Sequence, residues 1–104
     1  MPATKKDNLT IAADAADIGQ KYGIPENEFK IYFDVNGEAW EGLKVEKINM
    51  SGTILGYSGS CSIPLKHGKY DVAVYTTQGE LVRERREGIM FDGDKILRFT
   101  LKPR

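Results

Sequence analysis

The 104-residue chain has one cysteine, one histidine and no excess of charge, because 15 basic residues balance 15 acidic ones. A single cysteine excludes an internal disulfide, and a balanced charge provides no long-range field to attract nucleic acid or an anionic membrane. The first thirty residues lack the continuous apolar run of a secretory signal, and no stretch approaches the length of a transmembrane helix. We therefore expect a cytoplasmic or virion-associated protein that binds neither nucleic acid nor membranes, unless Met1 was added to a mature secreted chain.

The N-terminal 28 residues have a pattern of their own. Residues 1–8 are polar and aperiodic, which predicts a loose tail. From Leu9 onward, apolar residues recur every three or four positions, as they do along one face of a helix. These residues are Ile11, Ala15, Ile18 and Tyr22. Asn8 or Thr10 could cap this helix, and Gly23 could end it.

The expected helix is about twelve residues long, and helices of that length are marginal in water. Gly19 lies inside it and costs up to about 1 kcal/mol relative to alanine. The helix must therefore dock its apolar stripe on the rest of the protein or on a neighbouring subunit. We expect residues 1–28 to form a tail and a short helix that act as a docking arm or oligomerisation element, and residues 29–104 to form the β-sandwich domain.

Residues 29–104 show the alternation of half-buried strands. Asn36-Gly37 supplies the turn dipeptide of a hairpin, and Ser58-Gly59 is expected to separate two later strands. The predicted strands cover 29–35, 43–49, 53–57, 60–65, 69–76, 80–86 and 95–102. Because no helical crossover interrupts them, we predict a mainly β fold, a seven-stranded antiparallel β-sandwich of the Greek-key type.

The same alternation identifies the side chains that should point into the core. They are Phe29, Ile31, Phe33, Val35, Val45, Ile54, Ile63, Leu65, Tyr70, Val72, Val74, Leu97, Phe99 and Leu101. Truncating one of the large ones to alanine should cost about 2–5 kcal/mol of stability.

Several stretches carry a family resemblance. They are Gly37-Glu38-Ala39-Trp40-Glu41-Gly42-Leu43-Lys44-Val45, Gly59-Ser60-Cys61-Ser62-Ile63-Pro64-Leu65, Gly68-Lys69-Tyr70-Asp71-Val72-Ala73-Val74 and Leu101-Lys102-Pro103. Together they resemble carboxypeptidase regulatory-like domains over about residues 29–103. The resemblance implies a transthyretin-like or immunoglobulin-like sandwich, which in this family is normally a non-catalytic accessory of an enzyme, receptor or surface protein.

The motif residues have physical roles in such a scaffold. Gly68 stands where the chain must turn sharply, and the Tyr70 hydroxyl can bond a loop carbonyl at the edge of the sandwich. Two positions depart from the family pattern, because Ser58 replaces an acidic residue and Cys61 replaces an aromatic one. Residues 1–28 have no counterpart in the family, and no catalytic residue carries over.

The few residues that could carry chemistry have simpler interpretations. His67 stands alone in a Lys-His-Gly turn, and one histidine does not make a metal site. Cys61 falls on an inward face, where a free cysteine is a small hydrophobe rather than a nucleophile. Asp92-Gly93-Asp94 lacks the ligand spacing of a calcium loop and predicts a hairpin turn. We expect no catalytic, cofactor-binding or metal-binding residue.

Aromatic residues offer a possible contact surface. Tyr32 and Tyr75 fall on the outward faces of their strands, where exposed rings could contact a protein or stack on a sugar. Trp40 and Tyr57 could extend such a platform, but Trp40 occupies an apolar position of the family motif, which favours packing.

The run Arg83-Glu84-Arg85-Arg86-Glu87 is dense in charge. Charges along a strand discourage edge-to-edge pairing, and the alternative is a surface for an acidic protein partner.

The sequence favours a non-enzymatic module that acts through protein–protein contacts, with another chain or with itself as a homo-oligomer. A virion decoration or tail accessory protein would fit, and so would an assembly protein. The expected contact residues are Ile11, Ile18, Tyr22, Tyr32, Tyr75, Arg83, Arg85 and Arg86. The alternative is a carbohydrate-binding accessory module that uses the exposed aromatic rings.

Overall fold

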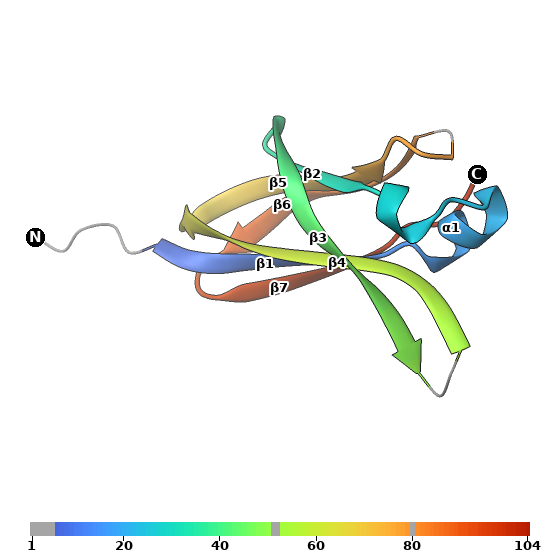
Figure 1. Ribbon diagram of the computed structural model, residues 1–104. Helices are drawn as coiled ribbons and strands as arrows, with labels where there is room; N and C mark the ends of the chain where they lie inside the picture. Colours follow the sequence, from blue (N-terminus) through green and yellow to red (C-terminus); the bar gives the residue numbers. More distant parts are fainter. Residues whose placement is uncertain (1–5, 51–52, 80) are drawn as a thin grey trace, which may run out of the picture.

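The computed structural model describes residues 6–50, 53–79 and 81–104, without the side chains at 16, 26, 41–42, 44–50 and 53–56. Within these ranges the chain is mostly strand (Figure 1). The elements are β1 (Lys6–Asp14), α1 (Ala16–Tyr22), the 3-10 helix η1 (Glu26–Glu28), β2 (Ile31–Val35), β3 (Glu38–Met50), β4 (Thr53–Lys66), β5 (Gly68–Thr76), β6 (Val82–Phe91) and β7 (Lys95–Thr100).

The strands are hydrogen-bonded to one another in the order β6-β5-β2-β3-β4-β1-β7. They are arranged in two layers, one of three strands and one of four. The long strand β3 joins the layers, because its first half pairs with β2 and its second half pairs with β4. β5 returns to lie beside β2, so β5-β2-β3-β4 have the Greek-key order. The predicted mainly β sandwich is confirmed. One pair departs from the antiparallel expectation, since β1 runs parallel to β7.

The first apolar segment is a strand and not the expected helix. Leu9, Ile11 and Ala13 are buried and their neighbours are more exposed, which is the two-residue period of a strand. β1 pairs on one side with β4 and on the other with β7, and this double pairing outweighs local helix preference. The helical spacing of Ile11, Ala15 and Ile18 is therefore a coincidence that spans the end of β1 and the start of α1. Of the two docking sites left open for this segment, the structure shows the sandwich itself, since β1 is one of its strands and Ile18 of α1 lies in its core.

The true helix is short and begins after Ala15, so Asn8 and Thr10 are not its caps. Its end is where the sequence predicts, at Gly23, which has a φ of 62° in the left-handed region. Of the expected loose tail, residues 1–5 lie outside the described part of the chain, and Lys6–Asn8 belong to β1.

β4 is one strand of 14 residues where two strands were predicted. The expected turn at Ser58-Gly59 is absent, because Gly59 pairs with Ala13 of β1 on one side and with Val45 of β3 on the other. Both neighbouring strands continue past this point, so the chain has no freedom to turn. The missed β1 and the divided β4 offset each other in the predicted number of strands.

The turn at residues 92–94 also differs from its prediction. It follows β6 and precedes β7, but β7 pairs with β1, and β6 pairs with β5. The turn therefore joins the two layers and does not close a hairpin. β6 itself extends to Phe91, beyond the predicted end at residue 86.

The hairpin between β2 and β3 is confirmed. Val35 pairs with Glu38, so the loop is Asn36-Gly37, and both loop residues have positive φ, 51° and 82°. Positive φ at both positions is the backbone of the favoured two-residue hairpin turn. The backbone nitrogen of Asn36 also donates a hydrogen bond to the backbone carbonyl oxygen of Asp71 at 2.8 Å, which ties this hairpin to β5.

His67 alone separates β4 from β5, at a corner where the chain passes from one layer to the other. The Tyr70 hydroxyl donates to the Lys66 carbonyl oxygen at 2.7 Å, which is the bond to a loop carbonyl that the sequence predicts. The His67 ring meets the Phe91 ring edge-on, with centroids 6.0 Å apart. Its Nε2 is hydrogen-bonded to Oδ2 of Asp7, at the start of β1.

The core fills the space between the layers. The predicted core residues that are buried are Phe29, Ile31, Phe33, Val35, Ile63, Val72, Val74, Leu97, Phe99 and Leu101. Leu65 and Tyr70 are half-buried against this cluster, and Val45 and Ile54 lie outside the described side chains. Buried residues that the prediction missed are Leu9, Ile11, Ala13, Ala15, Ile18, Leu43, Ala73, Thr76, Val82 and Phe91.

Tyr57 of β4 joins α1 to the sandwich. Its ring lies so close to Gly19 that a Cβ at Gly19 would overlap it. The other contacts of the ring are a stack on Phe29, with centroids 4.7 Å apart, and a hydrogen bond from its hydroxyl to the Ile24 carbonyl oxygen. The glycine that is unfavourable for the helix is therefore required by the packing of the helix.

Candidate functional site

The expected contact residues divide between the core and the surface. Ile11 and Ile18 have no exposed surface, because one lies on the inner side of β1 and the other on the buried side of α1. Their expected role in partner contact is therefore wrong. Tyr22 is half-buried, and its ring occupies the space beside Gly79 that a Cβ would need. Tyr22 therefore serves the internal packing.

Tyr32, Tyr75 and Arg83 meet on the outer face of the three-stranded layer. In the strand register, Tyr32 of β2 pairs with Tyr75 of β5, and Tyr75 pairs with Arg83 of β6. Directly paired residues point to the same face of a sheet. The tyrosine rings are stacked, with centroids 5.6 Å apart and planes inclined by 23°. The Arg83 guanidinium carbon lies 4.5 Å from the Tyr75 ring centroid, in a cation–π contact.

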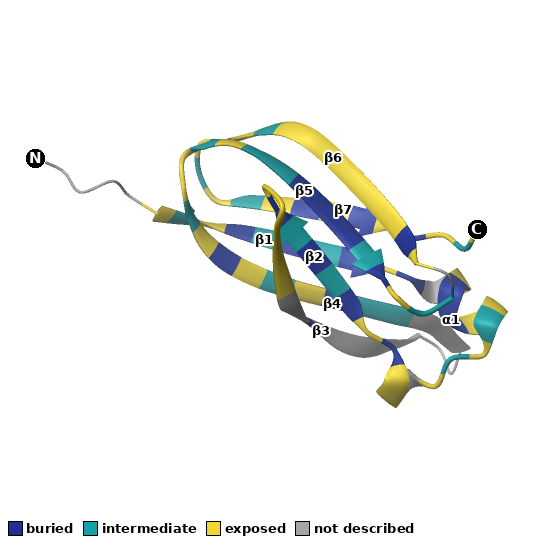
Figure 2. Ribbon diagram, turned by 90° about the horizontal axis from the view of Figure 1, so that it is seen from above, coloured by how far each residue is buried: buried dark blue, intermediate teal, exposed yellow. Residues whose placement is uncertain are grey.

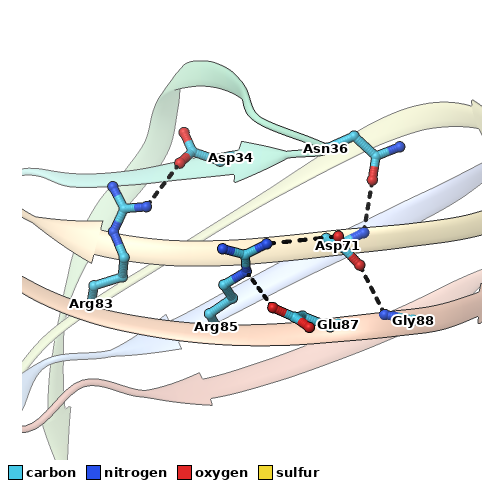
Figure 3. Close-up of polar contacts among 7 residues, drawn as sticks. All are labelled: Asp34, Asn36, Asp71, Arg83, Arg85, Glu87 and Gly88. Atoms are coloured by element: carbon cyan, nitrogen blue, oxygen red, sulfur yellow. Dashed lines mark hydrogen bonds and ion pairs between the residues drawn. The ribbon is translucent and has the colours of Figure 1, made fainter.

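Ion pairs continue this surface along the strands (Figure 3). Arg83 Nη1 lies 3.4 Å from Asp34 Oδ2. Arg85 Nε lies 3.1 Å from Glu87 Oε1, and Arg85 Nη2 lies 3.7 Å from Asp71 Oδ2. We call the whole surface the tyrosine–arginine face, which consists of Tyr32, Asp34, Asp71, Tyr75, Arg83, Arg85 and Glu87.

Asp71 fixes the backbone beneath this face. Its Oδ1 accepts a hydrogen bond from the Gly88 amide nitrogen at 2.9 Å, at an irregularity in the pairing of β5 and β6. Gly88 has a φ of 65°, which favours glycine. The Asp71 amide nitrogen donates to Asn36 Oδ1 at 2.8 Å (Figure 3). The face is therefore held on β2, β5 and β6 together.

The environment of Tyr75 moves the pKa of its hydroxyl further above physiological pH. Burial raises the pKa of Tyr75 above its ordinary value of 10.0, and the Asp34 carboxylate raises it further. Tyr75 is therefore a neutral phenol at physiological pH, which can donate and accept hydrogen bonds.

The shape of the face suits a flat contact better than a small ligand. Its hollow, between Asp34, Asp71, Arg83 and Arg85 above Ala73, has a volume of about 90 Å³. Clefts that bind drug-sized molecules usually have about 300–1,000 Å³. A partner would therefore lie across the rings and charges rather than enter a cavity.

Arg86 does not belong to this face. It pairs in the register with Val72, which is fully buried, so its side chain leaves β6 on the inner side. Its guanidinium carbon lies 4.3 Å from the Phe99 ring centroid, and its Nη2 donates to the Arg98 carbonyl oxygen.

Trp40 and Tyr57 do not extend the pair of tyrosines into a larger platform. Trp40 is 38% exposed and stacks on buried Phe33, with centroids 6.1 Å apart. Phe33 alternates with Tyr32 along β2, so Trp40 lies on the opposite side of the sheet from the tyrosine–arginine face. The Tyr57 ring is taken up by the packing of α1.

The structure also places the other candidates for chemistry. Among the side chains that the structure describes, there is no group of three or more His, Cys, Asp or Glu residues that could hold a metal ion. His67 and Asp7 form a pair at the layer corner, a partner that sequence alone did not identify. Asp94 Oδ1 accepts a hydrogen bond from the backbone nitrogen of Asn8 at 2.8 Å, which ties the turn after β6 to β1.

Cys61 is half-buried against the core, and burial raises the pKa of its thiol from 9.0 to about 11. At pH 8 the thiolate should be about a hundredfold rarer than in the unfolded chain, so alkylation by iodoacetamide should be about a hundredfold slower. Because the folded state holds this proton more tightly, the contribution of Cys61 to stability should fall as pH rises from 9 towards 11. Equal alkylation rates in native buffer and in denaturant at pH 8 would contradict this environment.

In the part of the chain that the structure describes, no helix has the length and apolar character to span a membrane. Comparisons of the chain with protein-family models, with curated proteins and with solved structures found no match. The resemblance to carboxypeptidase regulatory-like domains therefore stays a prediction.

Sequence reasoning identified four members of the face, Tyr32, Tyr75, Arg83 and Arg85, and missed the acidic members. The signal was present in part, since Asp34 alternates with Phe33 on β2 and so faces the same way as Tyr32. The sequence does not show that β2 pairs with β5, and this pairing brings the side chains of the two strands together on one face.

Proposed function

We propose that the protein is a non-enzymatic interaction module that binds another protein through the tyrosine–arginine face. The observation that carries this proposal is the cluster of Tyr32, Tyr75 and Arg83, in which a guanidinium covers one of two stacked rings. Tyrosine and arginine are enriched among the residues that dominate the binding energy of protein interfaces.

The preorganisation of the cluster supports the proposal. Its residues lie on three hydrogen-bonded strands, and Asp34 holds Arg83 in position beside Tyr75. Binding to side chains that are already held in place costs less conformational entropy than binding that must first order them. The binding energy of the rings would therefore be largely available for affinity.

The charges around the rings would select the partner. Side chains of Arg85 and Glu87 are 54% and 67% exposed, at the margin of the rings. Charges at the rim of an interface affect the association rate and the choice of partner more than the affinity. A partner with a complementary pattern of charges is therefore favoured.

The scaffold that we propose is transthyretin-like, and its closest functional analogy is an accessory module in a larger assembly. The partner could then be a different chain or a second copy of this one. A decoration or tail accessory protein of a virion and an assembly protein both belong to this class of function.

Carbohydrate binding through Tyr32 and Tyr75 is the second candidate, because exposed rings can stack on the apolar faces of sugars. The geometry favours it less. Arg83 covers one face of Tyr75, and the two rings stack on each other. Fewer ring faces are therefore free for a sugar than the sequence suggests.

The double substitution Tyr32→Ala and Tyr75→Ala tests the proposal. We expect the variant to lose at least about tenfold in affinity for proteins that the wild type captures from its own cells, since two dominant contacts are removed. The measurement is quantitative co-purification, followed by titration of each captured protein. Thermal unfolding of the variant should stay close to that of the wild type, because both side chains lie on the outer face.

The matched control is Thr10→Ala with Ser62→Ala. These hydroxyls bond each other at 2.7 Å on the outer face of the other layer, and their loss should leave capture unchanged. Capture that is equal in wild type and in the tyrosine variant would refute the proposed face. A glycan array with hits that the tyrosine variant loses would establish the carbohydrate alternative instead.

A further inference from the structure

A groove lies between the two ends of the strand order. β6 and β7 each have a neighbour on one side, and among the described strands neither has one on the other. The groove between them has a volume of about 480 Å³, which is within the range of binding clefts. We call it the β6–β7 groove, and its lining residues are Val82, Arg83, Glu84, Arg86, Thr100, Lys102 and Arg104.

β6 presents charged residues to this groove where a closed sandwich would have core. Glu84 and Arg86 pair in the register with Val74 and Val72, which are fully buried, so both charged side chains point to the inner side. Both are nevertheless exposed, and Figure 2 shows β6 exposed along most of its length between buried ends. The sandwich is therefore open along this side.

Arg86 is the side chain that bridges the opening. It covers the Phe99 ring and donates a hydrogen bond to the Arg98 carbonyl oxygen in β7. The Arg98 carbonyl oxygen therefore points from β7 towards β6, two positions before Thr100 of the groove lining. On the side without a neighbouring strand, β7 thus has a backbone acceptor that Arg86 now uses, of the kind that a further strand would use.

The groove is predominantly basic. Its one acidic lining residue is Glu84, and Arg83 is already paired with Asp34. In the described part of the chain, Arg86, Lys102 and Arg104 form no ion pair with a carboxylate. These cations would complement an acidic ligand.

We propose that the β6–β7 groove binds an extended acidic segment of another protein. This segment would pair with the open edge of β7 as an additional strand. Main-chain hydrogen bonds would provide affinity, and the basic side chains would select for acidic residues, as in other cases of strand addition. The groove shares only Arg83 with the tyrosine–arginine face, so this proposal does not rest on the function proposed above.

Two other occupants fit the observations less well. A second copy of this chain would bring the same predominantly basic lining against the groove, and like charges opposite each other are destabilising. Single-stranded nucleic acid binds on exposed aromatic rings, but the lining of the groove contains none, and Arg86 covers Phe99.

The experiment is a fluorescence anisotropy titration of the full chain with a labelled peptide of about eight residues, in which glutamate alternates with threonine. The comparison protein is Lys102→Glu with Arg104→Glu, since both residues follow β7 and are exposed. We expect this variant to bind at least about tenfold more weakly than the wild type at about 0.15 M salt.

The control variant is Lys30→Glu with Lys69→Glu, which makes the same change in net charge at exposed positions outside the groove lining. Its affinity should stay within about twofold of the wild type. A peptide with alternate backbone nitrogens methylated keeps its charges but cannot pair as a strand, and it should bind at least about tenfold more weakly.

Several results would overturn the proposal. They are no binding of the peptide by the wild type, equal loss in the two charge variants, equal binding of the methylated peptide, or tighter binding of an oligothymidine of equal charge. Equal loss would indicate attraction by net charge alone, and the oligothymidine result would indicate a nucleic-acid groove.

Discussion

Replacing Ile11 by aspartate is expected to prevent folding. Ile11 has no exposed surface and lies in the middle of β1, between Cys61 of β4 and Leu97 of β7. Burial of an unpaired carboxylate costs several kcal/mol, and the total stability of a small domain is about 5–15 kcal/mol. The measurement is far-ultraviolet circular dichroism of the purified variant during thermal and urea unfolding.

The neighbouring substitution Ala12→Asp is the matched control, since it introduces the same charge one position along the strand. Ala12 lies on the outer side of β1, opposite Ser60 and Arg98 in the register, so its aspartate should be tolerated within about 1 kcal/mol. Ile11→Ala should fall between the two, with a loss of about 2–5 kcal/mol. A cooperatively folded Ile11→Asp protein would show that β1 is not a core strand.

Gly19→Ala is expected to destabilise the protein although alanine is the better helix former. Helix preference alone predicts a gain of up to about 1 kcal/mol. The new Cβ would overlap the Tyr57 ring, which is held between Phe29 and the Ile24 carbonyl. Overpacking of this kind costs about 1–3 kcal/mol, so the net change should be a loss in urea unfolding.

A double-mutant cycle with Tyr57→Ala separates the two effects. Removal of the ring should itself cost about 3–5 kcal/mol, as for other large aromatic truncations. In that background Gly19→Ala should become neutral or stabilising, because only helix preference remains. Gly93→Ala is the control, since a Cβ there meets no atom within 4 Å. Destabilisation by Gly19→Ala that persists without the ring would show that the Tyr57 contact is not its cause.

Local sequence was sufficient where one segment determines its own structure. The turn at Asn36-Gly37 requires only two residues with access to positive φ, and the alternation of β2 and β5 identifies their buried sides. The Tyr70 hydroxyl bond is similarly local, because its acceptor is four residues away. These features could be predicted because no distant strand takes part in them.

Prediction from the sequence failed where pairing with a distant strand determines the local structure. Apolar positions at 11, 15 and 18 fit a helix, and only the pairing of β1 with β4 and β7 makes the first of them part of a strand. In the same way, Ser58-Gly59 has the composition of a turn, but neighbours on both sides keep it extended. Gly19 was counted as a cost to the helix because the position of Tyr57 could not be known.

The candidate site shows the same division. Alternation placed Tyr32 and Tyr75 on outward faces, and both belong to the tyrosine–arginine face. That they stack on each other follows from β5 lying beside β2, a pairing between strands that are not consecutive. The opposite directions of Arg85 and Arg86 follow from their register with Ala73 and Val72.

The parallel pairing of β1 with β7 has a consequence for how the chain is made. Leu9–Asp14 lie beside Lys95–Thr100, so one of the two partners of β1 is synthesised long after it. During synthesis β1 can pair with β4, but its other edge stays open until residue 100 has emerged. Contacts this distant in sequence slow folding and expose strand edges to aggregation. The four-stranded layer can therefore be completed only after β7 has been synthesised, and one edge of β1 stays unpaired until then.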